Sequence, residues 1–151
     1  MIFIGAAFIT VGAFDLRPAL LLKNATITSA EPSNKINWQP YSDEALVKAR
    51  VLHKPVLIDF WADWCAACKE LELYTFSSPS FQNMAAHFVL LKFDATNETE
   101  KLRELKNKYS LVGLPTLVIY DETGVFRKDL TVTEFLEAPA LVTKMQEALK
   151  K

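Results

Sequence analysis

The feature that most constrains this chain is a short apolar run that leads directly into a pair of cysteines. Residues 56–61, VLIDFW, are rich in β-branched and aromatic side chains, which is typical of a strand buried on both faces of a sheet. Cys65 and Cys68 follow at once, and Leu71 and Tyr74 continue an apolar stripe at helical spacing as far as about residue 76. The sequence therefore predicts a buried strand that turns straight into a helix, with Cys65 at the helix N-terminus.

The remaining sequence alternates helices and strands. Further helices are expected over residues 42–53, 80–86, 97–109 and 133–149, and further strands over residues 88–93, 116–120 and 125–132. The last of these strands is expected to be a weaker edge strand, joined to its predecessor in a hairpin, and Pro139 is expected to interrupt the last helix. This alternation predicts an α/β fold in which helices flank a central mixed β-sheet.

Charge and cysteine content exclude two broad classes of protein. Seventeen Lys and Arg against eighteen Asp and Glu give a net charge of -1, so there is no basic excess to bind the phosphates of a nucleic acid. Two cysteines in 151 residues are too few for a disulfide-stapled scaffold, and both lie in one stretch. We therefore expect the cysteines to serve chemistry, in a monomeric domain that does not bind nucleic acid.

The first 37 residues differ in composition from the rest of the chain. Residues 1–14 carry no charge, and a helix of that length would rise only about 21 Å, short of the roughly 30 Å hydrocarbon core of a bilayer. We interpret residues 1–22 as the membrane-proximal end of a transmembrane helix, with a signal peptide and a buried N-terminal strand as alternatives. Residues 23–37, rich in Ser, Thr and Asn, are expected to be a linker to a folded domain at residues 38–151.

The cysteine pair has the spacing of a redox-active disulfide. Residues three apart on a helix are neighbours, so the sulfurs of Cys65 and Cys68 can form a disulfide with little movement of the backbone. The unpaired N–H groups and the dipole at the helix N-terminus favour a thiolate at Cys65, which makes it the nucleophile and Cys68 the resolving thiol. This disulfide would act without a separate cofactor.

Other uses of the cysteines fit the sequence less well. A zinc site needs four ligands, and the additional soft candidates, His53 and His87, are far apart and match no zinc-binding spacing. Haem attachment needs a histidine directly after the second cysteine, where Lys69 stands instead. An inert buried pair is the plainest alternative, because a free cysteine packs well in a core.

Two acids and a proline are further candidate site residues. Asp59 lies in the middle of an apolar strand, where burial would raise its pKa and let it relay the proton of Cys68, unless it reaches solvent at a strand end. Glu72 stands four residues after Cys68, so its carboxylate can lean back over that thiol or be a solvated helix acid. Pro115 opens a strand, where a cis proline would present the Leu114 backbone to an extended partner and a trans proline would merely begin the strand.

The charges around the pair predict the direction of electron flow. Ala66 and Ala67 between the cysteines supply no cation, whereas Asp59 and Glu72 would both oppose a thiolate. A poorly stabilised thiolate means a less stable dithiol and therefore a more reducing couple. We expect a protein-disulfide reductase and not an oxidase that introduces disulfides.

The motifs IDFWADWCAACK and GLPT are similar to those of the thioredoxin superfamily. More closely, the chain resembles the C-terminal domain of DsbD-type thiol:disulfide interchange proteins through INWQPY, KELELYTF and FDATNETEKLRELKNKYSLVGLPTLVIYDETG, from about residue 37 to residue 137. The resemblance implies a thioredoxin fold. It also implies that Cys65 and Cys68 form the active pair, that Asp59 and Glu72 are the acids that modulate it, and that Pro115 is the cis proline. The candidate substrate-binding positions are Trp64, Leu114 and Pro115.

The resemblance also implies a cellular setting. In that family the domain lies in the periplasm after a transmembrane region, receives electrons from the membrane part and passes them to an N-terminal periplasmic domain. Disulfide isomerases and cytochrome c maturation factors are reduced downstream. The implied partners here are a membrane electron-donor domain and periplasmic thiol-disulfide proteins, with the chain tethered at the periplasmic face of the bacterial inner membrane. Because the family's multi-helix region and N-terminal module are not in this sequence, we expect either a fragment or a short stand-alone relative.

Three functions are compatible with the sequence. The first is an electron relay of the DsbD type, and the second is a membrane-anchored thioredoxin that reduces exported proteins or apocytochrome c directly. The third is a non-catalytic binding or chaperone module that uses the groove beside Pro115. The intact pair of Cys65 and Cys68 argues against the third function.

Overall fold

The structure, a computed structural model, describes residues 36–150. The membrane-proximal segment expected at residues 1–22 lies outside the described residues, as does the expected linker apart from residues 36 and 37. Between residues 36 and 150, no helix has the length and apolar character needed to cross a membrane.

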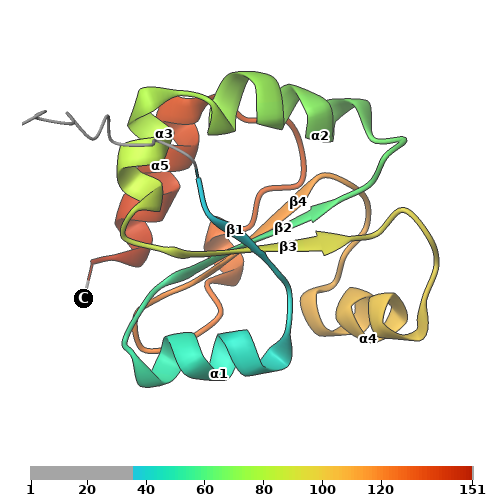
Figure 1. The fold of residues 1–151 in the computed structure, drawn as a ribbon, viewed down its shortest axis with the longest axis horizontal. Coiled ribbons are helices and arrows are strands. Elements are labelled where there is room, and N and C mark those ends of the chain that lie inside the picture. Colours follow the sequence, from blue (N-terminus) through green and yellow to red (C-terminus); the bar gives the residue numbers. More distant parts are fainter. Residues whose placement is uncertain (1–35, 151) are drawn as a thin grey trace, which may run out of the picture. The chain divides into compact units, whose positions relative to one another are not determined.

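The described residues form a four-stranded sheet with the strand order β1-β3-β2-β4 (Figure 1). The strands are β1 (Trp38–Pro40), β2 (Val56–Trp61), β3 (Val89–Asp94) and β4 (Thr116–Tyr120). Strand β3 pairs in parallel with both β1 and β2, whereas β4 pairs antiparallel with β2. The sheet is therefore mixed, as the sequence predicts, and the strand that leads to the cysteines is one of its two central strands.

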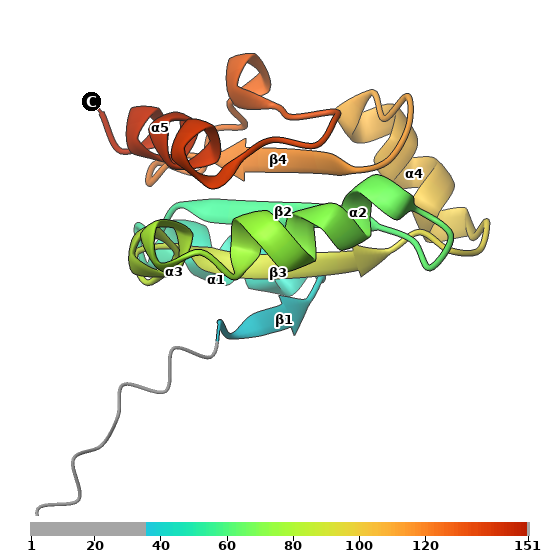
Figure 2. The same ribbon diagram turned by 90° about the horizontal axis from the view of Figure 1, so that it is seen from above.

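Helices cover both faces of this sheet. The helical segments are α1 (Asp43–Val51), α2 (Ala66–Glu70), the π-helix η1 (Leu71–Phe76), α3 (Pro79–Ala85), α4 (Glu100–Tyr109), the 3-10 turn η2 (Lys128–Leu130) and α5 (Ala138–Ala148). Figure 1 shows α2, α3 and α5 on one face and α1 with α4 on the other. In the turned view of Figure 2, α2 and α3 run alongside β2 and β3, and α5 runs alongside β4. The fold is the predicted α/β sandwich.

The alternation of side chains along β2 divides them between two cores. Leu57 is buried in the core that η1, α3 and α5 complete, whereas Ile58 and Phe60 are buried in the core under α1 and α4. Successive side chains of a strand point to opposite faces, so Asp59 shares its face with Leu57. The carboxylate of Asp59 therefore points to the side of the sheet on which the cysteine helix lies.

Two predictions about the C-terminal part are wrong. Residues 125–132 form no strand: they make two isolated bridges to β4, and η2 interrupts the pairing between them. The last helix begins at Ala138 and not near residue 133, with Pro139 in its first turn. Proline has no backbone N–H, and an N–H in the first helical turn would have no partner within the helix, so this proline starts the helix and does not interrupt it.

Candidate active site

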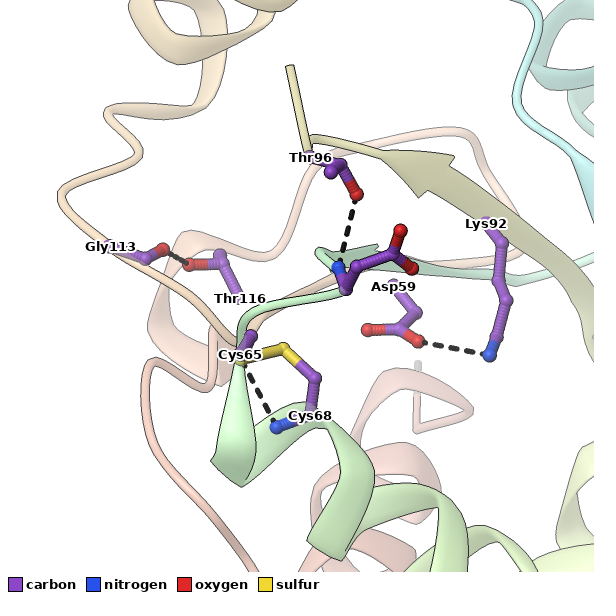
Figure 3. The surroundings of a disulfide bond; sticks show 8 residues. Asp59, Cys65, Cys68, Lys92, Thr96, Gly113 and Thr116 are labelled. Atoms are coloured by element: carbon purple, nitrogen blue, oxygen red, sulfur yellow. Dashed lines mark hydrogen bonds and ion pairs between the residues drawn. A yellow bond between two sulfur atoms is a disulfide. The ribbon is translucent and has the colours of Figure 1, made fainter. Parts of the chain in front are cut away.

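Cys65 and Cys68 form a disulfide at the start of the helix that follows β2 (Figure 3). Cys65 is the N-cap of α2, and its Sγ accepts a hydrogen bond from the backbone N–H of Cys68 at 3.1 Å. Both residues are only 4% exposed, and their Cα atoms lie 5.3 Å apart. The predicted position of the pair at a helix N-terminus is confirmed, and the N–H groups of that first turn would stabilise a thiolate on Cys65 in the dithiol form.

The helix that carries the cysteines changes from α to π geometry at Leu71. Thr75, within the π-helix, is fully buried, and its Oγ1 donates a hydrogen bond to the carbonyl oxygen of Leu136 at 2.5 Å. The wider turn directs Leu71, Thr75 and Phe76 into the core, while Tyr74 is 66% exposed. The prediction that Tyr74 continues the buried stripe is therefore wrong, because that stripe assumed α-helical spacing throughout.

Asp59 is buried on β2, directly in register with Lys92 on the parallel strand β3. The Nζ of Lys92 lies 3.6 Å from Oδ2 of Asp59, and Oδ1 has no hydrogen-bond partner among the described residues. Burial raises the pKa of Asp59 to about 6, and the charge of Lys92 opposes this rise only in part. In the view of Figure 3, the carboxylate lies between the disulfide and Lys92. The expected buried acid is confirmed, and the alternative of an acid that reaches solvent is wrong.

Lys92 connects Asp59 with the second candidate acid. Its ammonium also forms an ion pair with Glu72, whose side chain is 48% exposed. The same Nζ lies 5.2 Å from the ring centroid of Trp38 and 5.6 Å from that of Trp61. Burial lowers the pKa of Lys92, and the Asp59 carboxylate opposes this change. The cluster thus holds two carboxylates and one ammonium, so its net charge is negative when Asp59 is ionised.

The peptide bond between Leu114 and Pro115 is cis and directly precedes β4. The side chain of Leu114 packs against the buried cluster that contains the disulfide. On the other side of the proline, Oγ1 of Thr116 donates a hydrogen bond to the carbonyl oxygen of Gly113 at 2.7 Å. The expected cis proline is confirmed, and the fold brings Leu114 to the disulfide from a distant part of the sequence.

Trp64 stands next to Cys65 and is 66% exposed. Its indole Nε1 donates a hydrogen bond to the carbonyl oxygen of Thr96 at 3.2 Å, in the loop between β3 and α4. Together with Leu114 it lines an open hollow of about 470 Å³ beside the disulfide. Other apolar walls of this hollow come from Leu102, Leu111 and Val112.

Two residues at the site were not predicted, namely Lys92 and Thr96. Lys92 is the single charged residue in the apolar run FVLLKF, just as Asp59 is in VLIDFW. Opposite charges that stand alone in two neighbouring buried strands could have indicated a cross-strand ion pair. No sequence signal distinguishes Thr96, because its hydrogen bonds depend on the path of a loop.

The arrangement supports reversible transfer of two electrons between a dithiol and a disulfide. Cys65 and Cys68 can supply the sulfurs, and Asp59, with its pKa near 6, can exchange a proton close to neutral pH. Within residues 36–150, His, Cys, Asp and Glu side chains nowhere gather in the groups of three that could hold a metal ion.

The mixed sheet, the disulfide at the helix start and the cis proline together define a thioredoxin-like protein. The family model described as Thioredoxin-like matches residues 37–122, and the chain belongs to this family. Within it, the chain resembles the C-terminal domain of the thiol:disulfide interchange protein DsbD. Two of its relatives and one solved structure illustrate how far that similarity extends.

The relatives are both named "Thiol:disulfide interchange protein DsbD". The protein of Photorhabdus laumondii is 37% identical over 114 residues, which are 76% of this chain and 19% of that protein. The protein of Cronobacter sakazakii is 40% identical over 108 residues, 72% of this chain and 18% of that protein. The chain thus spans about a fifth of the length of these relatives.

Among solved structures, the reduced C-terminal domain of Neisseria meningitidis DsbD superimposes with a TM-score of 0.63 at 26% sequence identity. The match covers 70% of this chain and 92% of that domain. The similarity is therefore to nearly the whole of one domain of DsbD, with the same type of fold throughout.

Proposed function

We propose that the chain is a protein-disulfide reductase that passes electrons by thiol-disulfide exchange from a membrane donor to periplasmic partner proteins. The observation that carries this proposal is the buried disulfide of Cys65 and Cys68 at a helix start, beside Leu114 and an open hollow with both apolar and polar walls. The similarity to the C-terminal domain of DsbD supports the direction of transfer and the class of partner.

In the first step, the thiolate of Cys65 attacks one sulfur of the partner's disulfide. The partner's S–S bond breaks, a mixed disulfide forms between Cys65 and the partner, and the second partner sulfur leaves as a thiolate that takes up a proton. Trp64 and Leu114 line the hollow next to Cys65, so the partner segment that carries the attacked sulfur would lie against them. At this point the S–S bond within the partner has been replaced by the S–S bond between Cys65 and the partner.

In the second step, Cys68 releases the partner. Its thiol gives a proton to the carboxylate of Asp59, and the resulting thiolate attacks the sulfur of Cys65 in the mixed disulfide. The Cys65–Cys68 bond forms as the bond between Cys65 and the partner breaks, and the partner's sulfur leaves as a thiolate that takes up a proton. The partner is thus released as a dithiol that has gained two electrons. A donor dithiol at the membrane then reduces the domain's disulfide by the same exchange in reverse.

The charge cluster supports the reducing direction. Two carboxylates, Asp59 and Glu72, share one ammonium, Lys92, so the site is negative when Asp59 is ionised. A negative environment disfavours a thiolate and thereby the dithiol form, which makes the couple more reducing. We place the chain at the periplasmic face of the inner membrane, with residues 1–22 as its anchor, residues 23–37 as the linker and residues 38–151 as the domain.

Insulin reduction, with dithiothreitol as the reductant of the protein, tests the proposed chemistry. The wild-type chain should accelerate insulin reduction, Cys65→Ser should abolish the acceleration, and Cys68→Ser should accumulate a mixed disulfide through Cys65. Equal rates for the wild type and Cys65→Ser would overturn the proposal and favour a binding module that does not turn over.

Redox equilibration with glutathione tests the proposed direction. A potential near that of thioredoxins, about -270 mV, is expected, whereas a value near about -120 mV would identify an oxidase. The partner class is tested separately with Cys68→Ser, which should trap exported thiol-disulfide proteins such as a disulfide isomerase or a cytochrome c maturation factor. Recovery of cytoplasmic partners alone would refute the periplasmic assignment.

A further inference from the structure

The loop between β3 and α4 is fastened to the segment that leads into Cys65. The N–H of Ala95 donates to the carbonyl oxygen of Trp61 at 2.8 Å, and the N–H of Asp63 donates to Oγ1 of Thr96 at 3.0 Å. Trp64 completes the connection through its indole N–H, which donates to the carbonyl oxygen of Thr96. Three consecutive hydrogen bonds therefore join this loop to residues 61–64, immediately before the cysteine.

Thr96 is central to this connection because it makes two of the three bonds. Its own N–H donates to Oδ1 of Asp94 at 2.8 Å, which closes a tight turn and fixes the direction of both Thr96 acceptors. Figure 3 shows the Thr96 hydroxyl directed at the backbone of the segment that leads into Cys65, where it accepts the hydrogen bond from the N–H of Asp63. The side-chain hydroxyl of Thr96 thus holds the backbone of the segment, and the backbone carbonyl oxygen of Thr96 holds the Trp64 ring.

The position of Trp64 gives this connection a consequence for binding. Trp64 is 66% exposed, although an indole with so much apolar surface usually packs against other side chains. Its N–H is satisfied within the protein, and its ring forms a wall of the hollow beside the disulfide. An aromatic ring that is held in the open before a partner arrives loses little conformational freedom when the partner binds.

We propose that Thr96 is a positioning residue for partner docking, which holds Trp64 as a fixed wall for the partner's segment next to Cys65. This inference rests on the proposed reductase function. Thr96 touches neither sulfur in this arrangement, so it should affect how well a protein partner binds and leave the exchange chemistry unchanged.

The test compares Thr96→Val with Thr96→Ser. The valine variant keeps the shape and loses the acceptor for the N–H of Asp63, whereas the serine variant keeps the hydroxyl. Thr96→Val should raise the KM for insulin about three- to tenfold with little change in kcat, the range expected for one lost hydrogen bond. Thr96→Ser should remain close to the wild type.

Three further readouts separate docking from chemistry. Reduction of 2-hydroxyethyl disulfide, which is too small to fill the hollow, should proceed at the wild-type rate in Thr96→Val, and the glutathione potential should not change. The NMR signal of the Trp64 indole N–H should shift or broaden in Thr96→Val. Thr143→Val is a matched control, since it removes a hydroxyl that bonds the Pro139 carbonyl on α5, and it should leave all four measurements unchanged.

A wild-type chain that fails to reduce insulin would overturn the proposed function and this inference with it. An active wild type with an unchanged KM in Thr96→Val would overturn the inference alone, as would equal losses with insulin and the small disulfide. If Thr96→Val does not fold, Asp94→Ala provides the second test, because it loosens the turn and leaves Thr96 intact. Asp94→Ala should then raise the KM for insulin without affecting the small disulfide, and an unchanged KM would refute the inference.

Discussion

Replacing Asp59 by asparagine should stabilise the protein near neutral pH. The carboxylate is buried, and its pKa rises from 3.8 to about 6 chiefly because burial disfavours the charged form. Folding therefore becomes less favourable as Asp59 ionises. Asparagine removes this ionisation, and Lys92 keeps its ion pair with Glu72, so the substitution leaves no buried cation without a partner.

The magnitude follows from the two pKa values. Below pH 3.8 the carboxyl group is protonated in both the folded and the unfolded chain, and it has no effect on the pH dependence. As the pH rises from there, the unfolded chain releases the proton first, and stability falls until the pH has passed the folded-state pKa of about 6. A difference from 3.8 to about 6 corresponds to a loss of about 3 kcal/mol.

The assay is urea unfolding of the oxidised protein, followed by circular dichroism at several values between about pH 4 and pH 7.5. The difference in unfolding free energy between Asp59→Asn and the wild type should grow by about 2.5 kcal/mol across that range, because a small part of the loss has already occurred at pH 4. Asp129→Asn is the matched control. Asp129 is exposed, and its hydrogen bonds with Arg127 lower its pKa, so the unfolding free energy of Asp129→Asn relative to the wild type should fall as the pH rises. Parallel curves for Asp59→Asn and the wild type would refute the reasoning.

Two further substitutions test other parts of the structure. Asp59→Asn should lower the pKa of the Cys65 thiol in the reduced protein more than Glu72→Gln does, because Asp59 is buried and Glu72 is half exposed. Thiolate absorbance measures the thiol pKa in both variants, and the reverse order would contradict the charge argument. Gly124→Ala should destabilise the fold by about 1–2 kcal/mol in urea unfolding, since residue 124 has a φ of 80° and a Cβ there would lie 2.6 Å from Cγ of Arg50. Trimming Arg50 to alanine in that variant should recover only part of the loss, and full recovery would show that backbone strain is absent.

The elements nearest the cysteines were predictable because their patterns are local. Strand β2 has the predicted bounds of residues 56–61, and β4 has the predicted bounds of residues 116–120. Both strands are nearly continuous apolar runs between polar turns, which is the strongest signal that a buried strand gives. The CxxC spacing likewise identified the disulfide and its position at a helix start.

Features that depend on distant contacts were not predictable in this way. Strand β1 has only three residues and ends at a proline, so it gives no periodic signal, and only its pairing with β3 makes it a strand. The π-helix is tied by Thr75 to Leu136, which lies 61 residues further along the chain. Lys92 acquires its role only when β3 is placed beside β2. In each case the contacting residue is far away in sequence, so local sequence propensity gives no information about the contact.

Strand β1 also defines where the smallest working unit of this protein must begin. Trp38, its first residue, packs its ring against Phe76 of the π-helix and lies over the ammonium that Asp59 and Glu72 share. A shortened version that started at Tyr41 would retain both cysteines and the cis proline but would lack one edge of the sheet and the ring that shields Lys92 from water. The redox module therefore extends well upstream of its reactive sulfurs, and truncations intended to isolate it should keep strand β1 with Trp38.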